Sequence, residues 1–276
     1  MEAAVAGFQN LTIFTPKQRS MQKVVLDFTV VSNLALNESN HLLRMRAEEP
    51  LLAVAPGQFV NVEIPGSSEV FLRRPFSVFD ADPERGELSL LVKVLGRGSR
   101  TLCGVQPGQK VSVVYPLGRG YTLPGSEERV LAVGGGSGVA PLLFLARRAG
   151  LPPGRMQVIL GARSAGDHIP TEAYSRYATL SCTTEDGSLG TRGMVTDHPL
   201  FDRLEEFSRV YTCGPLPMMK AVAARATAAG RFCEVSLENL MACGFGVCLC
   251  CIEPTVHGNL CVCTEGPVFN INDLKW

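Results

Sequence analysis

The chain has 276 residues, of which 26 are basic and 26 acidic, so its formal net charge is zero. A length above the roughly 100–200 residues of one typical domain predicts at least two domains. The balanced charge gives no electrostatic reason to expect nucleic acid or an anionic membrane as a partner. No apolar run approaches the roughly 20 residues that span a bilayer, and the start MEAAVAGFQNLTIF lacks the pattern of a signal peptide. We therefore expect a cytoplasmic protein that binds small ligands or another protein.

Residues 22–115 contain about six short runs with the composition of β-strands, separated by turn signals. The segments 55–58 and 106–109 both contain Pro-Gly-Gln, in which proline fixes φ and glycine tolerates a positive φ. Such runs without helical periodicity predict an antiparallel β-barrel, for which we expect the bounds 1–122. Residues 1–20 have no clear pattern, and we expect them to be irregular or to add an edge strand.

From about residue 125 the expected strands alternate with expected helices. RVLAVGG, RMQVILGARS, ATLSCTTEDG and RVYTCGP are typical of strands, whereas VAPLLFLARRAG and PMMKAVAARATAAG are typical of helices that end at glycine. This alternation predicts a parallel, doubly wound sheet in a nucleotide-binding domain at 123–232. Residues 233–276 are rich in cysteine and glycine, and we expect them to form a separate tail.

The stretch RRPFSVFD, residues 73–80, combines side chains that suit a flavin nucleotide. Arg74 is a fixed fork of donors for phosphate oxygens, and Pro75 fixes the turn. Phe76 offers a flat apolar face and Ser77 a hydroxyl. The alternative reading is an ordinary barrel strand with a solvated arginine beside a core ring.

The stretch LLVKVLGRGSRTL, residues 90–102, ends an alternating strand in a glycine-containing turn. Gly98 and Ser99 lie where exposed N–H groups at a helix start can bind an anion, and glycine lets a phosphate come close. The alternative is a plain glycine turn.

The stretch LAVGGGSGVAPL, residues 131–142, has the strand, glycine turn and helix of a nucleotide site. Gly134, Gly136 and Gly138 precede Pro141 with a spacing that departs from G-x-G-x-x-G, because Val139 occupies the last glycine position. A purely structural turn is the alternative.

Cys213, Gly214 and Pro215 are expected at the carboxyl end of a parallel strand, where open α/β sheets bind their ligands. A cysteine in this position is also common as a small buried residue.

Residues 241–266 of the tail, MACGFGVCLCCIEPTVHGNLCVCTEG, contain six of the ten cysteines of the chain. The spacing C-x4-C-x2-C, followed by a further cysteine after eleven residues, is typical of plant-type [2Fe–2S] proteins. Four thiolates also suit zinc, although zinc sites favour two close C-x2-C pairs, and buried structural cysteine is a third possibility. The spacing selects Cys243, Cys248, Cys251 and Cys263 as the ligands and leaves Cys250 and Cys261 as packing residues.

The order of these motifs resembles the ferredoxin–NADP reductase superfamily, and the tail is similar to that of the electron-transfer subunits of class 1B dihydroorotate dehydrogenase. The resemblance extends over about residues 20–270 and also includes TEDGSLGTRGMVTD and VCTEGPVF. It implies an antiparallel FAD-binding barrel, then a parallel-sheet NAD-binding domain, then a [2Fe–2S] segment at 233–276. It places the FAD contacts on residues 74–77, on Leu91, Val92 and Lys93, and on Gly98 and Ser99.

The resemblance further implies a catalytic partner subunit that binds FMN and oxidises dihydroorotate in pyrimidine biosynthesis. The expected assembly is a heterotetramer of two subunits of each kind. Electrons would pass singly from FMN to the cluster and then to FAD, which gives a hydride to NAD⁺. We expect no catalytic acid or base in this chain, because the proton chemistry on dihydroorotate belongs to the partner.

Three alternatives stay open. NADP could replace NAD, because Arg163 and Ser164 follow the second expected strand, where arginine can bind a 2′-phosphate. The chain could instead be the diaphorase subunit of a sulfide dehydrogenase, a hydrogenase or an NADH-dependent reduced ferredoxin:NADP oxidoreductase. The last of these families has aspartate at the first cluster position, where this chain has Cys243. A zinc-stabilised binding module without electron transfer is the third reading.

Overall fold

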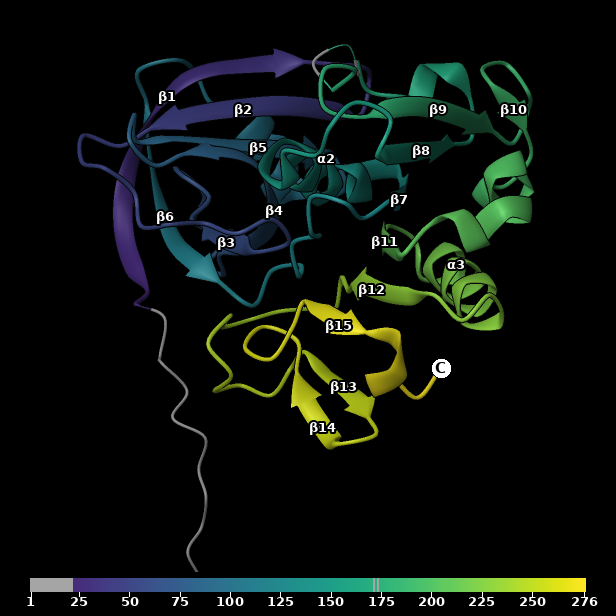
Figure 1. Ribbon diagram of the computed structural model, residues 1–276. Helices are drawn as coiled ribbons and strands as arrows, with labels where there is room; N and C mark the ends of the chain where they lie inside the picture. The colour runs from purple at the N-terminus through teal and green to yellow at the C-terminus, as the bar shows by residue number, and fades with distance from the viewer. Residues whose placement is uncertain (1–21, 171, 173) are drawn as a thin grey trace, which may run out of the picture.

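Figure 1 shows a computed structural model of the chain, in which residues 22–170, 172 and 174–276 are described. The expected edge strand within residues 1–20 lies outside these ranges. No helix in the described part of the chain is long and apolar enough to cross a membrane.

A closed antiparallel barrel forms the first part of the molecule, with the strand order β1-β2-β5-β4-β3-β6. The strands alternate in burial and enclose a core that contains Phe28, Leu43, Met45 and Leu90, all fully buried. The predicted barrel is therefore confirmed. Its elements are β1 (Val24–Ala35), β2 (Asn40–Arg46), β3 (Phe59–Val62), β4 (Arg74–Asp82), β5 (Glu87–Lys93), α1 (Arg97–Cys103) and β6 (Lys110–Leu117).

A seven-stranded sheet follows, with the order β10-β9-β8-β7-β11-β12-β15. All neighbouring strands are parallel except β15, which pairs antiparallel with β12. The predicted parallel sheet is confirmed, and both helices end as expected, with left-handed glycines at Gly150 and Gly230. The elements are β7 (Val130–Gly135), α2 (Val139–Ala149), β8 (Met156–Ala162), β9 (Thr179–Thr184), β10 (Thr191–Arg192), β11 (Arg209–Cys213), α3 (Leu216–Ala228), β12 (Phe232–Ser236) and β15 (Val268–Asn270).

Short 3₁₀ turns complete the connections between these elements. They are η1 (Gly136–Gly138), η2 (Ala165–Asp167), η3 (Val195–Asp197), η4 (Pro199–Glu206) and η5 (Ile271–Asp273).

The two faces of the sheet are covered differently. Helix α2 packs on one face and contacts β4, so that it lies between the sheet and the barrel. Helix α3 and the 3₁₀ segment η4 cover the other face, where Val133 and Ile159 of the sheet meet Leu204 and Val222. Because α2 bridges the two units, the barrel and the sheet form one continuous body (Figure 1).

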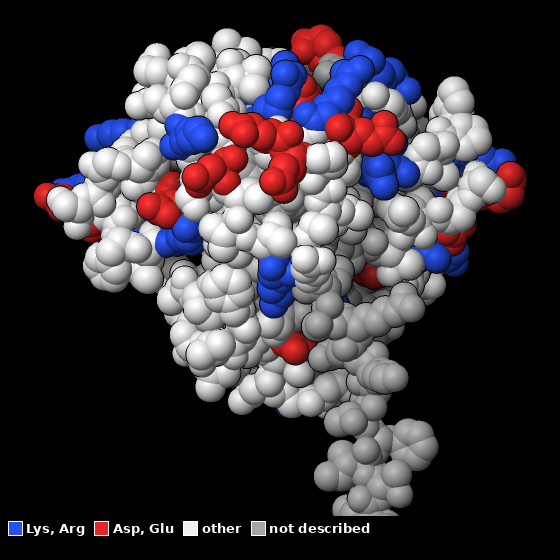
Figure 2. All heavy atoms as spheres, turned by 90° about the vertical axis from the view of Figure 1, so that its left-hand side faces the viewer, with Lys and Arg blue, Asp and Glu red and all other residues white. Residues whose placement is uncertain are grey.

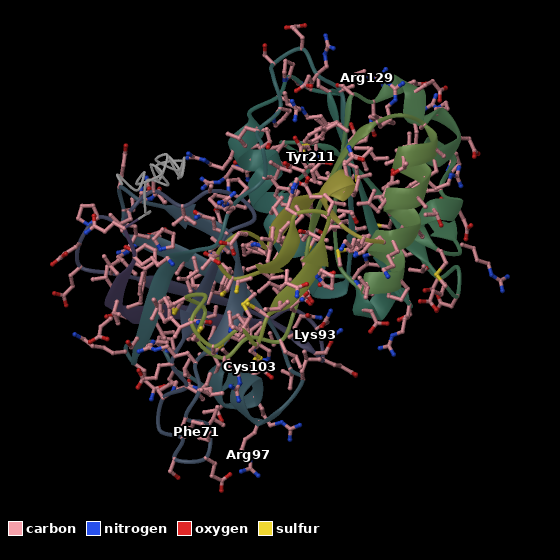
Figure 3. The ribbon with its side chains drawn as sticks, turned by 90° about the horizontal axis from the view of Figure 1, so that it is seen from below. Phe71, Lys93, Arg97, Cys103, Arg129 and Tyr211 are labelled. Carbon is pink, nitrogen blue, oxygen red and sulfur yellow. The ribbon has the colours of Figure 1, made fainter. Side chains whose placement is uncertain are left out.

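The sheet continues past the border expected at residues 232/233, because residues of the tail supply two strands of the sheet. Strand β12 runs over residues 232–236 and pairs with β11, and β15 at residues 268–270 closes the edge. Only the chain between them, with the hairpin of β13 (Ile252–Thr255) and β14 (Gly258–Cys261), stands apart from the sheet. Seen from below in Figure 3, it lies across the seam between barrel and sheet.

The surface of the barrel face carries both signs of charge. Figure 2 shows lysine and arginine side chains interspersed with aspartate and glutamate over this face, without an extended field of one sign. This agrees with the zero net charge and gives no electrostatic footprint for a polyanion on this side.

Candidate functional site

The four predicted cluster cysteines lie close together in the tail. Three of them lie within residues 243–251 and the fourth follows the hairpin of β13 and β14, and the group packs against the barrel. Cys251 and Cys263 are buried in a core with Phe59 and Leu117 of the barrel, whereas Cys243 is half-buried and Cys248 exposed. The site therefore has one side closed by protein and one side open to solvent.

Backbone N–H groups point at these sulfurs. The N–H groups of Phe245 and Gly246 donate to the Sγ atoms of Cys243 and Cys263 at 3.3 and 3.1 Å, and the N–H of Cys263 donates to the Sγ of Cys251 at 3.4 Å. Gly244 and Gly246 have φ values of 78° and 79°, which only glycine adopts without strain, so the turn can direct its donors inward. Donors around thiolate sulfur are what an iron–sulfur site needs, because they stabilise the charge on the ligands.

The thiols form two pairs. Desolvation alone would raise the pKa of Cys243, but hydrogen bonds from the Phe245 and Cys248 N–H groups and from the Cys248 thiol lower the pKa to about 6. Desolvation and the neighbouring Cys251 thiol raise the pKa of Cys263 to about 12. Within the described ranges, no three His, Cys, Asp or Glu side chains gather so as to hold a single ion. Two pairs of thiols agree with a two-iron cluster, in which each iron has two protein ligands.

The two other cysteines within residues 241–266, Cys250 and Cys261, differ from these four. Cys250 is exposed, and Cys261 is half-buried in β14, packed against the same core. In the described part of the chain, the backbone N–H groups that donate to sulfur in this segment have the Sγ atoms of Cys243, Cys251 and Cys263 as acceptors, and not those of Cys250 or Cys261. Cys261 therefore stays a predicted packing residue, whereas Cys250 is exposed and does not pack in a core.

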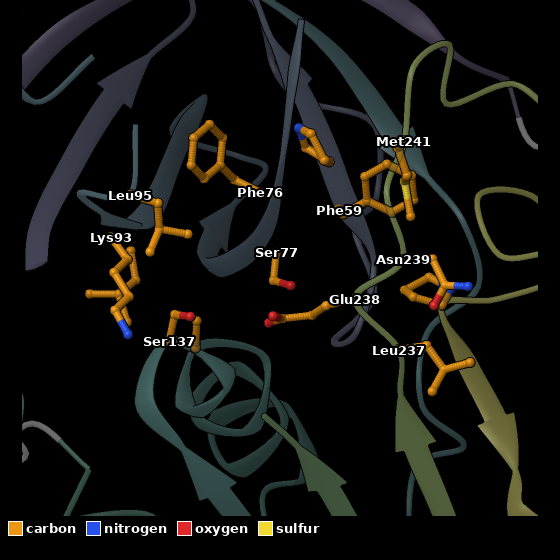
Figure 4. A pocket seen from close by; sticks show the side chains of 14 residues that line it. Phe59, Phe76, Ser77, Lys93, Leu95, Ser137, Leu237, Glu238, Asn239 and Met241 are labelled. Carbon is orange, nitrogen blue, oxygen red and sulfur yellow. The ribbon is translucent and has the colours of Figure 1, made fainter. Parts of the chain in front are cut away.

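The flavin is expected in a pocket of about 230 Å³ where the barrel, the glycine-rich turn and the tail meet (Figure 4). Five of the predicted contact residues line this pocket. They are Pro75, Phe76, Ser77, Leu91 and Lys93. The half-buried ring of Phe76 and the apolar side chain of Leu91 provide flat apolar walls, and the Ser77 hydroxyl provides a polar group, which suits an isoalloxazine ring.

The other predicted flavin residues lie outside this pocket. Val92 is 1% exposed in the barrel core, so only its backbone can face a ligand. Gly98 lies against the Arg74 side chain: a Cβ on this glycine would be 3.3 Å from the Arg74 Nε. The Ser99 hydroxyl accepts from the Leu95 and Gly96 N–H groups at 2.9 and 3.1 Å. Arg74 and Gly98 can therefore hold a phosphate beside the pocket, whereas Ser99 fixes the turn.

The pocket also has walls that the sequence motifs did not reveal. Ser137 comes from the glycine-rich turn, and Glu238, Asn239 and Met241 come from the start of the tail. Figure 4 shows the Glu238 carboxylate pointing toward Ser77 and Ser137. The signal that could have found Glu238 is its place directly after a buried strand, at the carboxyl edge of a parallel sheet.

The pKa of Glu238 lies above its ordinary value. Desolvation raises its pKa, and the positive charge of Lys93 opposes this rise. Lys93 in turn lines both this pocket and the neighbouring nucleotide pocket. A carboxyl group and a lysine thus face the place where the two ligands would meet.

The nicotinamide nucleotide is expected in a second pocket of about 650 Å³ at the carboxyl ends of β7, β8 and β9. This is the side of a parallel sheet on which open α/β folds bind their ligands. Gly136, with a φ of 57°, and the unpredicted Gly135 line this pocket, as does Pro215.

The other residues of these two motifs serve packing. A Cβ on Gly138 would lie 2.4 Å from the Cys213 carbonyl oxygen, and one on Gly134 would lie 3.0 Å from the Val139 side chain. Gly214 has a φ of 148° and turns the chain from β11 into α3. Cys213 is fully buried, and its pKa is raised well above the usual value by desolvation and then by the charge of Glu238. Its thiol therefore stays protonated.

Arg163 and Ser164, the residues that suggested NADP, are both hydrogen-bonded to the carboxylate of Asp167. Asp167 lines the nucleotide pocket together with Arg163. Its two oxygens lie 3.3 Å from the Arg163 Nη2 and 2.9 Å from the Ser164 Oγ. Glu185 adds a second carboxylate to the same wall. This arrangement leaves less free positive charge for a 2′-phosphate than the sequence alone suggested.

Matches to known families cover the three parts of the chain. The model of an oxidoreductase FAD-binding domain matches residues 27–121, and that of an oxidoreductase NAD-binding domain matches residues 132–224. The model of the iron-sulfur cluster binding domain of dihydroorotate dehydrogenase B matches residues 238–275. Fold and sites thus define a flavin- and nicotinamide-dependent oxidoreductase that carries its own iron–sulfur segment.

Curated relatives identify the family. The chain is 34% identical over 260 residues to "Dihydroorotate dehydrogenase B (NAD(+)), electron transfer subunit" of Shouchella clausii, which covers 92% of this chain and 99% of the relative. It is 32% identical over 258 residues to the protein of the same name from Fusobacterium nucleatum, with 90% and 98% covered. The chain belongs to the family of dihydroorotate dehydrogenase B electron transfer subunits.

Solved structures agree with this fold. A chain of the NADH-dependent reduced ferredoxin–NADP oxidoreductase superposes with a TM-score of 0.79 at 29% identity and covers 90% of both chains. The ferredoxin reductase of carbazole 1,9a-dioxygenase superposes with a TM-score of 0.67 at 21% identity, which supports the fold alone.

Proposed function

We propose that this chain carries electrons between the FMN of a catalytic dihydroorotate dehydrogenase subunit and NAD⁺, in the synthesis of pyrimidines. The observation that carries this proposal is the meeting of three sites at one seam. Lys93 lines both pockets, and Met241, which lines the flavin pocket, is two residues from the cluster cysteine Cys243. The names of the relatives, which are electron transfer subunits of an NAD(+)-dependent dihydroorotate dehydrogenase, support this partner and this nucleotide.

The proposed FAD site consists of the pocket around Phe76, Ser77 and Lys93, with Arg74 at its phosphate end. The proposed nucleotide site is the pocket at Gly136 and Pro215. The proposed cluster ligands are Cys243, Cys248, Cys251 and Cys263. When bound, the cluster supplies single-electron transfer, and the flavin converts electron pairs into hydride exchange with nicotinamide.

The reaction requires a source for one proton near the flavin pocket. Forming NADH from NAD⁺ and two electrons consumes one proton, which the one-electron cluster does not deliver. The Glu238 carboxyl group, whose pKa is raised, can hold this proton at an Oε atom in the pocket. Ser77, toward which the carboxylate points, can pass it on through its hydroxyl (Figure 4). A carboxyl group in this role goes beyond the sequence expectation of no acid or base.

NAD rather than NADP is the proposed nucleotide. Asp167 pairs with the Arg163 guanidinium and accepts a hydrogen bond from the Ser164 hydroxyl. Glu185 lines the same wall of the pocket. Two carboxylates disfavour a 2′-phosphate and can accept hydrogen bonds from ribose hydroxyl groups.

The open side of the cluster turn supports a protein partner. Leu240, Val247 and Leu249 are 85%, 81% and 58% exposed around the turn. Exposed apolar residues gathered in one place commonly mark protein interaction sites. We propose that the FMN-binding subunit docks here and that the assembly contains two subunits of each kind.

Reconstitution tests the proposed function. The purified chain, mixed with an FMN-containing dihydroorotate dehydrogenase from the same organism, is expected to reduce NAD⁺ when dihydroorotate is added, and neither chain alone should do so. Absence of this coupled activity, with flavin and iron both bound, contradicts the proposal.

The second candidate is a subunit of a ferredoxin-dependent NADP oxidoreductase, which the likeness to that structure favours. Copurification with a ferredoxin-oxidising partner, rather than with dihydroorotate dehydrogenase, would support it.

A further inference from the structure

One buried asparagine of the barrel reaches into the cluster turn. Asn61 lies on β3, is 1% exposed, and donates from its Nδ2 to the carbonyl oxygen of Cys243 at 3.1 Å. The two residues are 182 positions apart in the sequence. The bond thus ties the first proposed cluster ligand directly to the flavin-binding barrel.

The turn is fitted closely around this side chain. Gly244 has a φ of 78°, and a Cβ at this position would lie 2.3 Å from the Asn61 Nδ2. The apolar core nearby contains Phe59 and Leu117 of the barrel together with Cys251. In such a dry environment, leaving the Cys243 carbonyl without a donor is costly, so the bond holds the turn in one place.

The same asparagine lies next to residues that line the flavin pocket, although it does not line the pocket itself. Phe59, two residues earlier on β3, lines the pocket, and Asn61 stands opposite Pro75 in the pairing of β3 with β4. Pro75 lines the pocket too. From the tail side, Met241 lines the pocket and leads into Cys243. The amide of Asn61 therefore closes a hydrogen-bonded connection between the cluster turn and the pocket wall.

We infer that Asn61 is a positioning residue for electron passage inside this chain, because it fixes the turn at Cys243 and Gly244 against the wall of the flavin pocket. The inference rests on the proposed function, which requires both groups. Electron transfer slows steeply with distance and is faster through bonds and hydrogen bonds than across gaps. Groups that hold a metal ligand from behind are commonly as important as the ligand itself.

The test follows two signals in the full chain after rapid mixing with NADH. Flavin reduction reports the nucleotide and flavin sites, and cluster reduction, by absorbance and freeze-quench EPR, reports the passage between them. In Asn61→Ala we expect unchanged FAD and iron content, unchanged flavin reduction, an unchanged cluster potential, and cluster reduction slowed roughly ten-fold. The isosteric Asn61→Asp keeps the packing but places an acceptor against the Cys243 carbonyl, so it should slow the same step.

Asn33→Ala is the matched control. Asn33 also uses its amide to tie barrel segments together, by donating to the carbonyl oxygens of Cys103 and Val105 at 2.9 and 3.0 Å. It makes no contact of this kind with the tail, so its loss should leave cluster reduction at the wild-type rate.

Three results would overturn the inference. Cluster reduction at the wild-type rate in both Asn61 variants is the first. The second is slower cluster reduction that is explained by a shifted cluster potential, or that also occurs in the control Asn33→Ala. The third is loss of iron from both variants with FAD retained, which would assign Asn61 to cluster assembly instead. Failure of the proposed function itself would be seen separately in the wild-type protein. That protein would then bind no iron, or NADH would not reduce its cluster.

Discussion

Asp167 binds Arg163 and Ser164 at the same time, with its Oδ1 3.3 Å from the Arg163 Nη2 and its Oδ2 2.9 Å from the Ser164 Oγ. Replacing Asp167 by asparagine should release the guanidinium for a 2′-phosphate and remove one repelling charge. We expect the ratio of kcat/KM for NADPH to that for NADH to rise roughly ten-fold in dye-linked assays.

The control for this change is Asp186→Asn. Asp186 accepts from the Ser188 N–H and hydroxyl in the same region, at 2.9 and 2.6 Å, but does not line the pocket. Its replacement should leave the nucleotide ratio unchanged. An unchanged ratio in Asp167→Asn would show that the selectivity lies elsewhere, for example in Glu185.

The tail cysteines should divide into two groups. Serine at Cys243, Cys248, Cys251 or Cys263 removes a thiolate that receives N–H donors or belongs to a thiol pair, so iron content and the EPR signal of the reduced cluster should be lost or strongly changed. Serine at Cys250 or Cys261 should keep both. Iron loss from either of these two control variants, with FAD still bound, would mean that the ligand set is different.

Glu238→Gln tests the carboxyl group in the flavin pocket. The variant keeps the shape but has no titrating proton. Flavin reduction by single electrons from the cluster, which takes up a proton, should therefore slow by roughly 10²-fold and lose its pH dependence, whereas hydride transfer from NADH, which brings its own hydrogen, should be little changed. Stopped-flow flavin reduction across the pH range measures this. A wild-type pH profile in the variant would exclude Glu238 as the proton-holding group.

The same variant has a predictable effect on stability. Because desolvation raises the pKa of Glu238 in the folded state, the fold favours the protonated form. Its stabilising contribution is present below the ordinary pKa of 4.5 and is lost as the pH rises through the raised pKa. Glu238→Gln should therefore show a smaller loss of Tm between acidic and neutral pH than the wild-type protein shows.

Gly138→Ala tests the contact between the glycine-rich turn and the end of β11. The added Cβ would meet the Cys213 carbonyl at 2.4 Å, so backbone has to move and the free energy of unfolding should fall by about 1–3 kcal/mol. NADH affinity should fall with it. Gly125→Ala, where the nearest atom is 3.6 Å away and belongs to the Glu128 side chain, should be close to neutral in the same urea titration.

The features that sequence could predict are those set by local spacing. The alternation of β2 and β5 gives the barrel, and the interval between Cys243 and Cys251 gives the cluster type, because both depend on residues close in the chain. The glycine-rich turn follows from the same reasoning, but the sequence did not distinguish Gly136, which has the positive φ, from Gly134 and Gly138.

The features that sequence could not predict depend on contacts between distant segments. Asn61 and Cys243 meet only because the tail folds back onto β3, and the Thr122 hydroxyl donates to Glu234 at 2.8 Å across 112 positions. Strand β15 has three residues and no pattern of its own, so its pairing with β12 is decided by the finished sheet. The role of Glu238 likewise arises from where β12 ends.

Strands β12 and β15 clamp both ends of the cluster-bearing loop into the sheet that offers the nucleotide pocket. A carrier that shuttles on a hinge needs at least one free end, and this loop has none. The distance of each electron step inside the chain is therefore set by the framework of the sheet. The freedom to associate and separate lies with the partner protein, which we propose docks on the outer side.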